Sequence, residues 1–200
     1  WNYQISHVEG KLASANFAIS RSKNFLPRHI RKTLYNSLAR SHLEFGLLAY
    51  GGVKPGKLKK ITTLQKKCIR NVAGKGHRSH TGPLCAALNI LKFEDLYKYN
   101  CLNFMQKYVT KRQPISFIDF FAPFPNPNRT KGFHEDKLRL VFLSQFPTYQ
   151  LPKLWNLTLL ANKQIESHKV FKKTIHEDFI MDYPTAFKCK SRTCPDCRKI

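Results

Sequence analysis

The feature that most constrains the fold is the apolar stretch 34–51, which has dense positive charge on both flanks. Its large side chains recur at three- and four-residue steps, at Leu34, Leu38 and Phe45, with Tyr35 and His42 alongside. This spacing places them on one helical face that is wide enough to be a core stripe. The sequence therefore predicts a buried central helix that begins near Pro27 and ends at Gly46. Three basic residues are expected on its opposite side: Arg28, Arg31 and Lys32.

Three further segments, residues 1–24, 93–109 and 167–183, repeat apolar residues with helical spacing. Their expected inward positions are Ile5, Val8, Leu12, Ala15 and Ile19 in the first, Leu96, Tyr97, Cys101, Phe104, Met105 and Tyr108 in the second, and Val170, Phe171, Ile175, Phe179 and Tyr183 in the third. The prolines of segment 114–132 exclude a long helix, and its many Phe residues favour an irregular segment packed on a helical core over a base-stacking surface. Segment 137–146 suits a short strand or extended piece bounded by prolines.

The expected fold class is mostly α, a bundle of amphipathic helices with an irregular Pro/Phe-rich segment, a short β piece and a Cys-containing tail. We expect a helical domain over residues 1–110, the irregular segment with a C-terminal helix packed on it over 111–183, and the tail over 184–200. A hydrophobic content of 42% in 200 residues is enough to bury a core. No apolar run approaches the roughly 18–20 residues that a membrane-spanning helix needs, so we expect no membrane partner.

Charge is the strongest compositional signal. The chain has 35 Lys or Arg against 12 Asp or Glu, a formal charge of +23. Such an excess is typical of proteins that bind a polyanion, and nucleic acid is the first expectation. An anionic membrane surface fits less well, because the basic residues are interleaved with aromatic residues along the whole chain instead of forming one amphipathic anchor. An acidic protein partner stays open as an alternative.

The positive charge is concentrated in residues 53–79, which hold nine Lys or Arg and no acid. Within this segment Leu58, Ile61, Leu64, Cys68 and Val72 form an apolar stripe, which leaves the opposite side of the same helix basic. The predicted phosphate contacts are Lys59, Lys60, Lys66, Lys67 and Arg70, with Lys75 and Arg78 in the loop that follows. A Lys-rich face that serves only solubility is the alternative. The absence of an acid at four-residue spacing favours binding, because unneutralised charges on one face repel each other.

The six cysteines divide into two groups. Cys68, Cys85 and Cys101 are scattered and are expected to be small buried side chains in a reducing compartment. Cys189, Cys194 and Cys197 form a terminal cluster whose Cys-x2-Cys pair could hold one tetrahedral zinc ion. Structural zinc needs a fourth ligand, from a distant residue such as His176 or from another chain. The alternative is a reduced, flexible tail without metal.

Several motifs occur in a fixed order along the chain. They are Leu34-Tyr35-x-Ser37-Leu38-x-x-Ser41-His42-Leu43-x-Phe45-Gly46, then Gly51, Leu64-Gln65-Lys66-Lys67-Cys68-Ile69-Arg70, His80-Thr81-x-Pro83-Leu84, Leu88-x-Ile90-Leu91, Leu154-Trp155-Asn156 and Phe171-Lys172-Lys173. In this order they resemble the region just C-terminal to the polymerase palm in reverse transcriptases of non-LTR (LINE-type) retrotransposons, especially the jockey-like group. The resemblance covers most of the chain. It implies a thumb-like domain over residues 1–110 and, in related elements, a zinc-binding cysteine cluster near this terminus that has an additional His or Cys.

The resemblance implies a nucleic-acid-binding role without chemistry in this chain. A polymerase holds two metal ions with paired carboxylates, and no Asp-Asp pair occurs in the sequence. Such a region grips RNA, DNA or an RNA–DNA duplex during target-primed reverse transcription and adjoins the upstream polymerase domain of an RNA-directed DNA polymerase. The start at Trp1 and the lack of a signal peptide predict a piece of a longer nuclear or cytoplasmic polypeptide that is not secreted. The alternative is a basic protein-interaction or structural module derived from such an element.

Overall fold

A computed structural model describes residues 1–117, 120–123, 132–135 and 140–185. The described chain is mostly α-helical, as the amphipathic patterns predict, and its β pairing is one isolated bridge between Pro123 and Phe133. It divides into two compact units. Within the described ranges, unit 1 takes in Trp1–Gly46, Pro55–Glu94 and Asp178–Thr185, and unit 2 takes in Leu47–Lys54 and the described residues of Asp95–Glu177. No helix in the described ranges is both long enough and apolar enough to cross a membrane.

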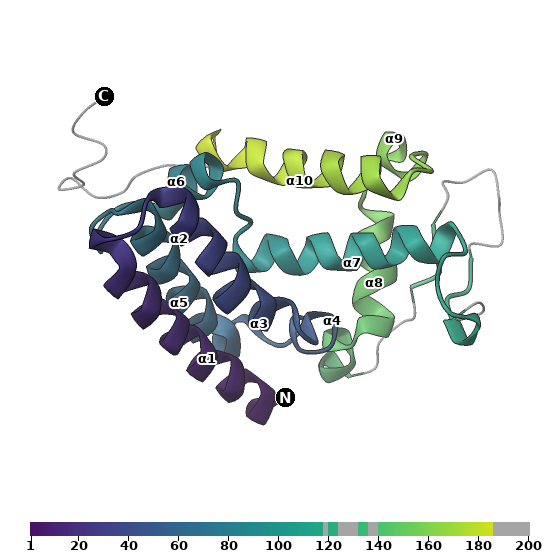
Figure 1. Ribbon diagram of the computed structural model, residues 1–200. Helices are drawn as coiled ribbons and strands as arrows, with labels where there is room; N and C mark the ends of the chain where they lie inside the picture. The colour runs from purple at the N-terminus through teal and green to yellow at the C-terminus, as the bar shows by residue number, and fades with distance from the viewer. Residues whose placement is uncertain (118–119, 124–131, 136–139, 186–200) are drawn as a thin grey trace. The chain divides into compact units, whose positions relative to one another are not determined.

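Unit 1 is built on two parallel helices, α1 (Asn2–Arg21) and α5 (Pro55–Ala73), which lie side by side (Figure 1). Their direction follows from cross-helix contacts, because Lys57 bonds Asn2, and Asn71, a few turns further along α5, bonds Asn16. The five apolar positions predicted for the first helix are all buried. The predicted stripe of α5 is buried too, except that Leu64 is only half-buried and that Gln65 and Ile69 join the core.

The central helix exists, but its predicted core face is wrong. It runs without a break from α2 (Arg28–Leu34) through the π-helical segment η2 (Tyr35–Arg40) to α3 (Ser41–Glu44). The buried residues are Tyr35, Ala39 and Leu43, at four-residue steps. Leu38 and Phe45 are 38% and 74% exposed, and Leu34 and His42 are half-buried. The π-helical turn takes more residues than an α-helical turn, so it keeps a four-residue repeat facing the core where an α-helix would have rotated it away.

The position predicted for Arg31 is also wrong. Its side chain was expected on the side opposite the core, but it is buried. Its Nη1 donates to the carbonyl of Lys23, just beyond the end of α1, at 2.9 Å. Its other terminal nitrogen lies beside Gly74, just beyond the end of α5, where a Cβ would stand 3.5 Å away. The C-terminal ends of parallel helices carry partial negative charge, which explains why a guanidinium is buried there.

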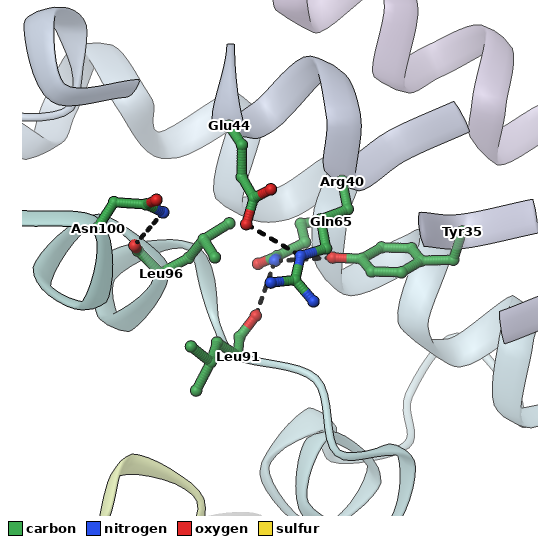
Figure 2. A network of polar contacts seen from close by, with 7 residues as sticks. All are labelled: Tyr35, Arg40, Glu44, Gln65, Leu91, Leu96 and Asn100. Atoms are coloured by element: carbon green, nitrogen blue, oxygen red, sulfur yellow. Dashed lines mark hydrogen bonds and ion pairs between the residues drawn. The ribbon is translucent and has the colours of Figure 1, made fainter. Parts of the chain in front are cut away.

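Helix α6 of unit 1 (Thr81–Leu88) begins with Thr81-Gly82-Pro83, which places the proline in the first turn, and ends at Asn89 in the left-handed conformation. A buried hydrogen-bond network joins the segment after it to the core. Gln65 donates from Nε2 to the Tyr35 hydroxyl and to the Leu91 carbonyl, and its Oε1 accepts the backbone N–H of Phe93 at 2.8 Å. Figure 2 shows the Gln65 amide between Tyr35 and Leu91, beside the Arg40–Glu44 ion pair. At the end of α10 (His168–Thr185), the Tyr183 hydroxyl accepts the backbone N–H of Lys92.

Unit 2 contains α4 (Leu47–Tyr50), η3 (Ile115–Phe117), η4 (Val141–Gln145), α8 (Pro147–Asn156), α9 (Leu160–Lys163) and most of α7 (Phe93–Val109) and α10 (His168–Thr185). The bounds of α7 are those predicted.

Trp155 of α8 packs on Phe171 of α10, and both are fully buried. A Cβ on Gly51 would overlap the Tyr97 ring, so this close approach requires glycine. His168 donates from Nδ1 to Gln106 Oε1 at 2.7 Å and so joins α10 to α7.

Two sequence predictions fail in unit 2. Of the extended piece expected over 137–146, residues 137–139 lie outside the described ranges. Val141–Gln145 form a 3-10 helix, in which the Ser144 hydroxyl donates to the Val141 carbonyl at 2.6 Å. The prolines that were expected to bound this piece lie in α8 instead, Pro147 at its first turn, where the missing N–H costs nothing, and Pro152 inside it. Val170, predicted to face inward, is 52% exposed.

Candidate nucleic-acid interface

The exposed side of α5 carries a row of cations. Lys59, Thr63, Lys66 and Arg70 follow one another at four-, three- and four-residue steps, and Lys67 lies beside them. From Lys59 to Arg70 the row is about 16 Å long at 1.5 Å per residue. That is roughly the length of five successive phosphates of one B-form strand, at about 3.4 Å each. The Thr63 hydroxyl donates to the Lys59 carbonyl at 2.8 Å, so cations alone are left to contact an anion.

Lys60 differs from its neighbours because it already has a counter-charge. Its Nζ lies 2.7 Å from Glu9 Oε2 of α1. The Lys60 side chain is 70% exposed, whereas that of Glu9 is only 14% exposed. Sequence spacing could not find this pair, because the acid lies on another helix. Of the five predicted helix contacts, Lys60 is therefore the weakest candidate, and Lys59, Lys66 and Lys67 are exposed.

The loop after α5 continues the positive surface. Gly74 has φ +72° and closes the helix with the bonds Gly74 N to Asn71 O and Lys75 N to Arg70 O, a Schellman motif. Arg70 donates from Nε to the carbonyl of Ser79 at 2.7 Å, which holds the loop against the helix. Burial lowers the pKa of Arg70. Lys75 and Arg78 are exposed in this loop, as predicted.

The charge balance around α5 is one-sided. Residues 1–46, 55–94 and 178–185 hold 16 Lys or Arg against three Glu and two Asp. Two of these acids are already in ion pairs, Glu9 with Lys60 and Glu44 with Arg40. Within the described part of unit 1, the positive charge of α5 therefore has little internal compensation. An external polyanion would relieve the repulsion between these side chains.

Zinc has no candidate site in the described chain, where no cluster of three or more His, Cys, Asp or Glu could hold a metal. The predicted ligands Cys189, Cys194 and Cys197 lie outside the described residues. Cys68, Cys85 and Cys101 are buried, as predicted, and burial raises the pKa of the Cys68 and Cys101 thiols to about 12. These thiols are protonated at neutral pH and unsuited to bind metal.

Sequence reasoning missed two features of this interface. Glu9 neutralises Lys60, and Arg70 is occupied in part by the Ser79 carbonyl. The only available signal was that both α1 and α5 are amphipathic, which does not say which of their polar edges meet.

Comparison with models of protein families, with curated proteins and with solved structures found no match for this chain.

Proposed function

We propose that this chain is a non-catalytic nucleic-acid-binding part of a reverse transcriptase, which grips the phosphate backbone of RNA, DNA or their hybrid with the exposed face of α5. The observation that carries the proposal is the row Lys59, Lys66, Lys67 and Arg70, continued by Lys75 and Arg78, with one acid, Glu9, paired at its edge. Phosphate contacts position a nucleic acid without reading its sequence, so the grip depends on charge and shape.

The assignment to a non-LTR retrotransposon rests on the ordered motifs of the sequence, from Leu34-Tyr35 to Phe171-Lys172-Lys173. In that setting the chain holds template and primer, or the target duplex, for a polymerase domain of the same polypeptide in the nucleus or cytoplasm. Cys189, Cys194 and Cys197 are proposed as zinc ligands that need a fourth donor. Metal content of the purified chain, compared with a variant in which all three are Ser, tests that part.

The binding proposal is tested by titrating the chain with a labelled duplex over a series of salt concentrations. Five exposed cations, Lys59, Lys66, Lys67, Lys75 and Arg78, predict a log–log slope of about −4 to −5 at roughly 0.9 per phosphate. Two unrelated sequences should give the same slope. Heparin and an acidic polypeptide serve as competitors. If the acidic polypeptide binds tightly while the duplex binds weakly and without the predicted salt dependence, the chain is a protein-interaction module instead.

A further inference from the structure

A second candidate site lies in unit 2, away from the basic row of α5 in the sequence. A cavity of about 330 Å³ opens at the C-terminal end of α7, at the small end of the roughly 300–1,000 Å³ range of ligand pockets. Half of its lining residues are aromatic, Tyr108, Phe117, Phe121 and Phe133, and Val109 and Pro123 add to the apolar wall, with Lys111 and Gln113 as polar members. Aromatic walls with few polar groups are typical of sites that take a flat ring.

The wall is held rigidly by contacts among these rings. The Tyr108 ring meets Phe121 edge to face with 5.0 Å between centroids, and Phe133 with 5.6 Å. The Tyr108 hydroxyl accepts the backbone N–H of Phe121 and donates to its carbonyl. Phe121 and Phe133 are buried, whereas Phe117 is half-buried. A ring that enters the cavity would therefore stack on a preformed surface.

Lys111 gives the cavity its charge and has an unusual backbone. It follows α7 with φ +54°, the left-handed conformation that favours glycine at the end of a helix. Its backbone N–H bonds the Tyr108 carbonyl, and that of Arg112 bonds the Lys107 carbonyl, which completes the helix end. A lysine stands where glycine would relax the chain, and its exposed side chain lines the cavity. Strained residues of this kind are concentrated at functional sites.

We propose that this cavity takes one unstacked base of a nucleotide, with Lys111 against the adjoining phosphate. The occupant is argued from charge complementarity, because Lys107, Lys111 and Arg112 surround this helix end and the chain as a whole is strongly positive. The inference rests on the proposed function and adds to it a preference for single-stranded segments, whose bases are free to leave the stack. The same chemistry would accept a free nucleotide, and the experiment separates the two sources.

The test compares two labelled eight-nucleotide single strands that bind the full chain, one with bases and one abasic throughout. They carry the same phosphates, so their affinity ratio reports base binding alone. We expect the strand with bases to bind about 5- to 140-fold more tightly, the range for one stacked base. Phe117→Leu, which keeps bulk but removes the ring, should bring the ratio close to one while the melting temperature changes little. A ratio near one in the wild type, or one that Phe117→Leu leaves unchanged, would overturn the proposal.

Lys111→Gly separates binding from folding. Glycine relieves the left-handed backbone, so the variant should be at least as stable as the wild type, yet it should bind the strand with bases less tightly. Lys169→Gln is the matched control, because it removes one exposed charge of unit 2 that has no ion pair within the described residues and does not line the cavity. Equal affinity losses in the two variants would contradict a role for Lys111.

Adenosine monophosphate as competitor identifies the source of the base. Displacement of the strand by the mononucleotide assigns the cavity to a free nucleotide, and its failure to compete assigns it to a strand. Lys66→Gln/Lys67→Gln should weaken both strands equally and leave their ratio unchanged. An unaltered salt slope in that variant would contradict the proposed α5 interface. The affinity ratio of the strand with bases to the abasic strand tests the cavity proposal independently of α5.

Discussion

Gln65 Nε2 donates a hydrogen bond to the Tyr35 hydroxyl over 3.0 Å, and both residues are almost fully buried in unit 1 (Figure 2). The same amide serves the Leu91 carbonyl and the Phe93 N–H. One side chain thus satisfies polar groups from the π-helical segment and from the start of α7. Burial raises the pKa of Tyr35 above its usual value, so the hydroxyl stays protonated.

Gln65→Leu should therefore cost more than the loss of a single hydrogen bond. It leaves the Leu91 carbonyl, the Phe93 N–H and the Tyr35 hydroxyl buried without their Gln65 partner, at about 1–3 kcal/mol for each group that cannot find another. We expect a loss of about 2–5 kcal/mol in urea unfolding. Tyr35→Phe removes only the hydroxyl and should cost about 1 kcal/mol. Equal losses for the two variants would show that the network does not depend on Gln65.

The phase of the central helix is tested by a matched pair of leucines. Leu43→Ala empties a fully buried site and should cost about 2–5 kcal/mol. Leu38→Ala changes a side chain that is 38% exposed and should cost less than about 1 kcal/mol. Thermal or urea unfolding of both variants gives the comparison. The reverse order would restore the face that the sequence alone predicts.

The sequence predicts the regular part of this fold well. The core faces of α1 and α5 and the bounds of α7 follow from a strict 3.6-residue repeat, which needs no knowledge of neighbouring helices. The core face of the central helix is predicted wrongly because η2 changes the number of residues per turn. A pattern fitted to an α-helix then selects Leu38 as buried instead of Ala39. Periodicity cannot detect such a change.

The candidate interface was predictable in its charge but not in its pairing. The exposure of Lys59, Lys66 and Lys67 follows from the apolar stripe on the other side of the same helix. The pairing of Lys60 with Glu9 depends on which edge of α1 meets α5. The burial of Arg31 likewise depends on two helix ends that tertiary packing brings together. Contacts between helices are not encoded in the repeat of either one.

His168 predicts a pH dependence of stability. Desolvation lowers its pKa first, and the charges of Lys172, Lys107 and Arg112 lower it further. The unfolded chain, with an ordinary His pKa of about 6.5, then binds more protons than the folded chain just below that pH. Stability should fall as the pH drops below about 6.5 and continues down through the lowered pKa. The measurement is the melting temperature from pH 7.5 to 5.5, as the difference between wild type and His168→Gln. A constant difference would contradict the shift.

The Lys60–Glu9 pair predicts opposite effects of two substitutions on nucleic-acid binding. Glu9→Gln releases the charge of Lys60, so the salt slope should steepen by up to about 0.9 and affinity for a duplex should rise. Lys60→Gln removes a charge that is already compensated and should change the slope by much less. The exposure of Lys60 keeps the cost to stability below about 1 kcal/mol. If Lys60→Gln flattens the slope as much as Lys66→Gln, the ion pair does not persist in solution.

The basic row of α5 is tested most directly by the salt dependence of duplex binding in Lys66→Gln/Lys67→Gln. Both side chains are exposed on the face opposite the core, so the melting temperature should hardly change. Loss of two phosphate contacts should flatten the log–log slope by about two, by the same amount for unrelated sequences, because backbone contacts carry no base information. A slope that stays at the wild-type value, or an affinity loss confined to one sequence, would show that this face of α5 is not the nucleic-acid surface.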